Sequence, residues 1–160
     1  MTGMRVAVAA DSAGVALKDV LAEAMRADDR VAEVTDFGVP DDGDERAYPL
    51  LGLEAAKAVA DGRVDRAVLC CGTGIGMAIT ANKVEGVRAT VAYDPYSVER
   101  SIKSNDCQVL CLGGRVIGAE LAKKIVDDWL GYSFDPGSAS AEKVAHITEY
   151  EQQRTGRDTP

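Results

Sequence analysis

The residues best suited to chemistry are Cys71 and the glycines that follow it, Gly72, Gly74 and Gly76. An apolar run leads up to Cys71 and a helical pattern over 77–82 follows, so we expect a strand, a tight turn and a helix. Glycines have no side chains, and the first N–H groups of a helix have no intrahelical partner, so an anionic group can approach this loop closely. The same helix end favours the thiolate of Cys71, the form that acts as a base or nucleophile.

The spacing of this loop excludes several familiar motifs. The order G-x-G-x-G differs from the dinucleotide fingerprint, and no G-K-[ST] follows to make a phosphate-binding P-loop. A phosphatase loop would need arginine in place of Gly76 or Met77. From the loop alone, two interpretations stay open: an anion cradle with a reactive cysteine, or a structural turn beside a buried cysteine.

Composition narrows the class of protein. With 160 residues and 46% apolar content, the chain can bury a core without disulfides or metal. The net charge of −8 argues against a nucleic-acid or membrane-surface partner. None of the four cysteines forms a C-x-x-C pair and the chain has one histidine, so we expect no metal and no cofactor. Free thiols and the lack of a signal peptide or membrane-length apolar run favour the cytoplasm.

Strand and helix patterns alternate along the chain. This alternation predicts a three-layer α/β/α, Rossmann-like domain with a five-stranded parallel sheet over residues 1–152, followed by a polar tail over 153–160. Lys18 is expected on the outer face of the first helix. The last helix has no strand after it, so it packs on its own domain or reaches a partner subunit. The expected strands cover 4–10, 31–37, 66–71, 88–93 and 108–112, and the expected helices cover 15–25, 48–61, 77–82, 96–104, 119–130 and 141–152.

Several polar residues follow predicted strands, where open α/β sheets bind ligands. Asp11 comes after the first strand and either contacts a ligand or caps the next helix. Tyr48 ends a long polar loop and is placed to close over a site. Arg115, in a G-G-R turn after the fifth strand, is better placed to bind an anion than to form a surface ion pair. The other cysteines are expected to pack in the core: Cys70, Cys107 and Cys111.

These motifs together resemble the ribose-5-phosphate isomerase type B family, which also includes the subunits of galactose-6-phosphate isomerase. The resemblance covers the chain from Arg5 to about Tyr150. It implies a metal-independent aldose–ketose isomerase that acts on a small sugar phosphate, as a homodimer or dimer of dimers with sites between subunits. The matching motifs are D-x-A-G at 11–14, Y-P at 48–49, C-G-T-G-I-G at 71–76, A-N-K at 81–83, N-D at 105–106 and G-G-R-V-I-G at 113–118.

The resemblance also implies roles for single residues. Cys71 would remove the proton next to the carbonyl group, and the glycine N–H groups would hold the resulting enediolate. Thr73 would act with Cys71 as a catalytic residue and, like Asp11, contact substrate hydroxyls, and Asn105 would position the reacting end. The remaining predicted substrate contacts are Ser12, Tyr48, Tyr93, Asp94 and Arg115.

Departures from the family leave the substrate open. Ser12, Tyr93 and Ser104 replace histidines that family members use to open a sugar ring. The first expectation is ribose 5-phosphate to ribulose 5-phosphate, with Tyr93, Asp94 or Thr73 opening the ring. The alternative is erythrulose 4-phosphate to erythrose 4-phosphate, because a tetrose whose terminal oxygen carries phosphate cannot close a furanose ring.

The phosphate contacts also depart from the family. Paired arginines typical of the segment 138–143 are absent, and Lys143 is the one cation left there. Arg115 in the G-G-R turn is therefore the main phosphate candidate. A non-catalytic phosphosugar-binding subunit is a further alternative, although such a protein would not need the thiol of Cys71.

Overall fold

Five parallel strands form the centre of the computed structural model, which describes residues 3–156. The strand order is β2-β1-β3-β5-β4. The three inner strands read as nearly continuous apolar runs, which is typical of strands covered on both faces. The strands are β1 (Met4–Ala10), β2 (Val31–Asp36), β3 (Arg66–Cys71), β4 (Ala89–Val91) and β5 (Val109–Gly113).

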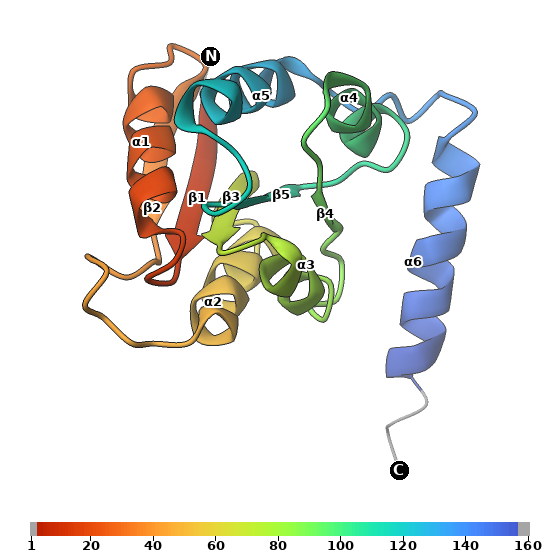
Figure 1. Cartoon of the computed structure of the whole chain (residues 1–160). Coiled ribbons are helices and arrows are strands. Elements are labelled where there is room, and N and C mark those ends of the chain that lie inside the picture. Colours follow the sequence, from red (N-terminus) through yellow and green to blue (C-terminus); the bar gives the residue numbers. More distant parts are fainter. Residues whose placement is uncertain (1–2, 157–160) are drawn as a thin grey trace.

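Helices cover both faces of the sheet (Figure 1). One buried cluster joins one face to α1 (Val15–Arg26), α4 (Pro95–Lys103) and α5 (Ala119–Gly131). A second cluster joins the other face to α2 (Tyr48–Ala60) and α3 (Ile75–Ala81). The predicted three-layer, Rossmann-like fold with five parallel strands is confirmed.

Element ends differ from the predicted ones by a few residues. Helix α3 begins at Ile75, two residues before the expected start, because Gly74 adopts φ 80° and lets the helix follow the loop at once. Strand β4 is shorter than expected because it lies at the sheet edge and pairs only with β5. The last helix, α6 (Ala141–Thr155), continues three residues beyond the expected end, and residues 157–160 of the expected tail lie outside the described residues.

Lys18 was expected on a solvent-facing side of α1, and that expectation is wrong. Its side chain is 2% exposed. Its Nζ donates to the Asp36 carboxylate at 2.7 Å and to the Val39 carbonyl oxygen at 3.2 Å. Burial acts to lower the pKa of Lys18, but hydrogen bonds to Asp36 and Asp19 outweigh it and hold the pKa above its usual value. Lys18 therefore anchors the chain after β2 to α1.

Helix α6 stands beside the edge formed by β4 (Figure 1). Among its described residues only Val144 is buried, and Ile147 and Tyr150 are 53% and 65% exposed. The carboxylate of Glu151 accepts a hydrogen bond from the N–H of Gly86 at 2.9 Å. None of the helices within residues 3–156 combines the length and apolar character needed to cross a membrane.

Candidate active site

The loop over residues 72–76, called the glycine loop here, begins where β3 ends. Cys71 is the last residue of β3, and its side chain is 4% exposed beneath the loop. The N–H of Gly74 donates to the Cys71 sulfur at 3.1 Å. Within residues 3–156, the N–H groups of Gly72 and Thr73 make no hydrogen bond, so they remain available to an anionic ligand.

The loops after β1, β3 and β5 pack directly on one another through glycines. A Cβ on Gly14 would lie 2.5 Å from the Cys70 carbonyl carbon, and one on Gly113 would lie 2.6 Å from the Thr73 Cα. A Cβ on Gly114 would lie 2.6 Å from the Ala13 carbonyl oxygen. These close approaches were not predicted, although a glycine soon after each strand was the signal for them. They bring the loops together at the carboxyl ends of the strands.

This position is a switch point of the sheet. From β1 the chain runs to β2 on one side of the sheet, and from β3 it runs to β4 on the other side, so the loops after β1 and β3 diverge. Open α/β sheets bind ligands in the crevice at such a point. The structure therefore brings the Asp11 loop and the Cys71 loop together where a ligand is expected.

Tyr48 lies against the glycine loop, and Thr73 is part of it. A Cβ on Gly76 would lie 2.5 Å from ring atoms of Tyr48, so this ring covers Gly76. The Thr73 hydroxyl oxygen accepts from the N–H of Ile75 at 3.3 Å. Its own proton remains free to donate, because a hydroxyl is both donor and acceptor.

Arg115 supplies positive charge beside the loop. Its N–H donates to the Gly72 carbonyl oxygen at 3.0 Å, and its guanidinium lies 3.4 Å from where a Cβ on Gly72 would be. Among the described residues, this guanidinium has no hydrogen-bond or ion-pair partner. It is exposed and available to an anionic group.

Asp11 and Ser12 belong to the loop after β1. One Asp11 carboxylate oxygen accepts from the N–H groups of Ala13 and Gly14, at 3.1 and 3.2 Å. Gly14, not Asp11, is the residue that caps α1. Asp11 is half-buried with its second oxygen available, and Ser12 is exposed beside it.

Tyr93 and Asp94 follow β4, and the structure gives both polar groups partners within the chain. The Tyr93 hydroxyl donates to the Thr73 carbonyl oxygen at 2.7 Å. Asp94 caps α4 by accepting from the N–H of Ser97 at 2.8 Å, and this hydrogen bond holds the pKa of Asp94 below its usual value. Tyr93 thus lies against the glycine loop, whereas the Asp94 carboxylate caps the amino end of α4.

Within one chain, Asn105 and Cys71 lie at opposite ends of the parallel strands. Asn105 precedes β5 by four residues, whereas Cys71 pairs with Gly113 at the other end of that strand. At about 3.3 Å per residue, β5 alone separates the two ends by roughly 13 Å. The Asn105 side-chain amide donates to the Arg100 carbonyl oxygen at 3.0 Å.

The other cysteines are buried, as predicted. Burial raises the pKa of Cys107 to about 11 and also raises the pKa values of Cys70 and Cys111 well above their usual value. These thiols therefore stay protonated at neutral pH. His146 is exposed on α6, where it contacts Glu149.

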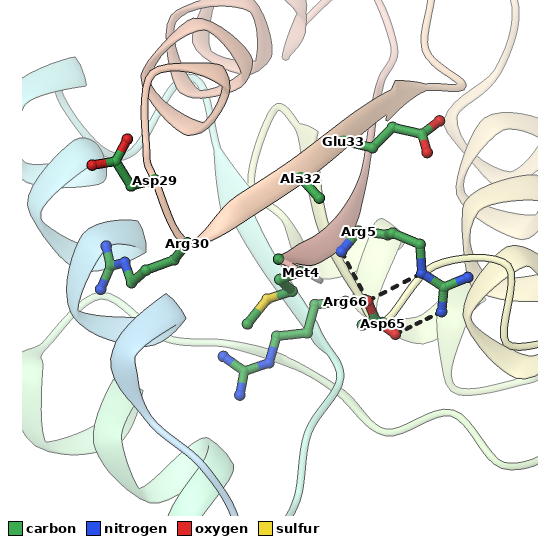
Figure 2. A pocket seen from close by; sticks show the side chains of 9 residues that line it. Met4, Arg5, Asp29, Arg30, Ala32, Glu33, Asp65 and Arg66 are labelled. Carbon is green, nitrogen blue, oxygen red and sulfur yellow. Dashed lines mark hydrogen bonds and ion pairs between the residues drawn. The ribbon is translucent and has the colours of Figure 1, made fainter. Parts of the chain in front are cut away.

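A cavity of about 1320 Å³ lies at the opposite edge of the sheet, near Met4 and Arg66 (Figure 2). Arg5 is paired with Asp65 there at 2.7 Å, while the Arg66 side chain extends away from that pair (Figure 2). The Arg66 guanidinium donates to backbone carbonyl oxygens of Trp129 and Tyr132. Because these cations are already engaged and the cavity lies at the amino ends of the strands, the loops around Cys71 at the carboxyl ends are the better candidate.

Comparisons with known proteins show the family of the chain. The family model described as Ribose/Galactose Isomerase matches residues 6–147. The chain is 52% identical to D-erythrulose-4-phosphate isomerase 2 of Mycolicibacterium smegmatis, over 92% of this chain and 97% of that one. It is 42% identical to ribose-5-phosphate isomerase B of Escherichia coli, over 94% and 98%. Ribose-5-phosphate isomerase B of Clostridium thermocellum has a similar structure, with a TM-score of 0.89 and 39% identity over 94% of this chain and 99% of that one.

The glycine loop, the convergence of the three loops and the matched length all lead to the same conclusion. The chain belongs to the ribose/galactose isomerase family of sugar-phosphate isomerases.

Proposed function

We propose that this protein interconverts D-erythrulose 4-phosphate and D-erythrose 4-phosphate, with Cys71 as the base. The observation that carries the substrate choice is the absence, among the described residues around the glycine loop, of the imidazole that family members use to open a sugar ring. Ser12 has no imidazole, and the Tyr93 hydroxyl and the Asp94 carboxylate already have partners within the chain. The one histidine of the chain lies on α6. A four-carbon 4-phosphate stays open-chain and needs no such group.

The reaction needs one base and a set of donors. The Cys71 thiolate removes a proton from C1 of the ketose, the electron pair forms a C1–C2 double bond, and O2 takes up the negative charge. The N–H groups of Gly72 and Thr73 stabilise that charge. With the Thr73 hydroxyl as the bridge, a proton passes from O1 to O2. Cys71 then returns its proton to C2, which leaves an aldehyde at C1.

The similarity to the Mycolicibacterium enzyme, named for erythrulose 4-phosphate, supports the four-carbon substrate. Ribose 5-phosphate is the second candidate, since the Escherichia coli and Clostridium relatives are named for it. For either substrate we assign the phosphate to Arg115, because its guanidinium lies beside the glycine loop without a carboxylate partner among the described residues.

We also propose that a homodimer, or a dimer of such dimers, completes the site. The side chains of Leu50, Ile75 and Ile79 on α2 and α3 are 62%, 56% and 57% exposed, close to the glycine loop. Apolar side chains grouped on a surface mark protein interfaces. Asn105 lies at the far edge of its own sheet, so the partner subunit's Asn105 is the copy that would reach the reacting end of the substrate.

The deciding experiment compares kcat/KM of the purified protein on D-erythrulose 4-phosphate and on ribose 5-phosphate. A strong preference for the tetrulose supports the proposal, and a strong preference for the pentose contradicts the four-carbon assignment. If neither is turned over while a sugar phosphate still binds, the protein is a binding subunit and the catalytic proposal fails. Cys71→Ala serves as the inactive control in both assays.

A further inference from the structure

Tyr93 reaches the glycine loop across an intervening strand. In the sheet, β5 lies between β3 and β4, so the residues after β3 and β4 are not direct neighbours. The glycine loop leans over the end of β5, where Gly113 leaves room for the Thr73 backbone. In that position the Thr73 carbonyl oxygen accepts the Tyr93 hydroxyl at 2.7 Å.

The peptide unit between Thr73 and Gly74 is therefore held at both ends. Its carbonyl oxygen accepts from Tyr93, and its N–H donates to the Cys71 sulfur at 3.1 Å. A peptide unit is planar, so fixing the carbonyl oxygen also fixes the direction of the N–H. Hydrogen bonds in such a chain polarise one another, so donation to the oxygen strengthens the N–H as a donor to sulfur.

We infer that Tyr93 is a positioning residue, which orients the Cys71 thiol through the Thr73–Gly74 peptide unit. The inference rests on the proposed role of Cys71 as the base. It assigns Tyr93 a role that does not require contact with substrate. The Tyr93 ring packs against the core cluster that contains α4 and α5, and this packing fixes the hydroxyl.

The hydroxyl is suited to act as a permanent donor. Burial raises the pKa of Tyr93 above its ordinary value near 10. Tyr93 therefore stays protonated over the range in which a thiol titrates. A change in Cys71 reactivity with pH would then report the thiol itself, not loss of the Tyr93 proton.

Tyr93→Phe tests the inference, because it removes the hydroxyl and keeps the ring. We expect kcat to fall about fivefold, the effect of one neutral hydrogen bond, with KM unchanged. The pH midpoint for alkylation of Cys71 by iodoacetamide should move to higher pH, measured by tandem mass spectrometry that separates Cys71 from Cys70. The matched control is Tyr96→Phe on α4, since Tyr96 is 72% exposed and should change neither quantity.

Each outcome bears on the inference. An unchanged alkylation profile and kcat would overturn it, and so would a raised KM with unchanged kcat, since that result would make Tyr93 a substrate contact. Thermal melting of Tyr93→Phe should match the wild type, and a large drop in melting temperature with a normal alkylation profile would make its role only structural. Alkylation needs no substrate, so the inference can fail while the isomerase proposal stands, and the reverse also holds.

Discussion

The N–H of Gly74 donates to the sulfur of Cys71 at 3.1 Å, which fixes the thiol beneath the loop that is expected to hold the substrate. Gly74 can make this contact because it adopts φ 80°, a conformation that other residues rarely take. The reactive sulfur and the nearby N–H donors thus come from one short segment of chain. The positions of the sulfur and of these N–H donors relative to one another therefore depend on the backbone angles of that segment.

Replacement of Cys71 by alanine should abolish catalysis and preserve the fold. Loss of a general base costs about 10²–10⁴-fold in rate. Transfer of solvent deuterium to C2 of the aldose should fall by that factor, as measured by NMR. Cys107→Ala is the control, because Cys107 is buried at the far end of β5 and its loss should leave exchange intact. Exchange at the wild-type rate in Cys71→Ala would remove Cys71 from the mechanism.

Gly113→Ala should displace the glycine loop. The added methyl group would lie 2.6 Å from the Thr73 Cα and 2.8 Å from the Gly72 carbonyl oxygen, and backbone atoms cannot yield cheaply. We expect a loss of about 1–3 kcal/mol in the free energy of unfolding together with loss of activity. Urea denaturation and steady-state kinetics measure the two effects.

Gly118→Ala is the matched control for Gly113→Ala. Gly118 lies five residues further along the same turn, and nothing lies within 4 Å of a Cβ placed there. The activity of the Gly118→Ala variant should equal that of the wild type. If the two variants lose activity to the same extent, close packing of the loops is not what the site depends on.

Much of the fold follows from the sequence, since β1 and β3 have the predicted bounds. Apolar runs that end in glycine or aspartate identify strands covered on both faces. Tertiary partners cannot be found in this way. Lys18 has the pattern of an exposed helical residue, and only the nearby end of β2 supplies the Asp36 that allows its burial.

The strand order had the largest consequence for the candidate site. The placement of β5 between β3 and β4 lets Tyr93 reach Thr73 across the end of β5. Local sequence patterns carry no information on that order, because it depends on which long crossovers pack best. Residues of the glycine loop could be predicted together because they are contiguous, whereas the hydrogen bond between Tyr93 and Thr73 could not.

Arg115→Met should weaken binding of the phosphate. A hydrogen bond to a charged group contributes about 1.5–3 kcal/mol, so KM for a sugar phosphate should rise on the order of 10–100-fold. Inhibition by inorganic phosphate should weaken in parallel. Arg63→Met changes the net charge equally at a site after α2 and should leave both values unchanged. An unchanged KM in Arg115→Met would place the phosphate elsewhere.

Ile79→Glu should disrupt the proposed dimer. Ile79 lies one helical turn from Ile75 on the outer side of α3, and a buried glutamate without a partner disfavours association. Sedimentation velocity should show the monomer, and activity should fall because the partner's Asn105 is lost from the site. Leu121→Glu, on α5 at the other face of the sheet, is the control and should leave the dimer intact. A dimer that survives Ile79→Glu would exclude this surface as the interface.

Asp65→Asn should change acid stability without affecting the site. The hydrogen bond from Arg5 lowers the pKa of Asp65 below its usual 3.8 in the folded state. A carboxyl group with a lowered pKa stabilises the folded state above its unfolded pKa, and this stabilisation is lost as the pH falls through the folded value. Both side chains are more than 40% exposed, so the effect at pH 7 should not exceed about 1 kcal/mol. The difference between the urea midpoints of variant and wild type should therefore be smaller at pH 3 than at pH 7, with kcat unchanged because the pair lies at the amino edge of the sheet. A gap in midpoints that is the same at both pH values would mean that the ionised carboxylate is not the source of the stabilisation.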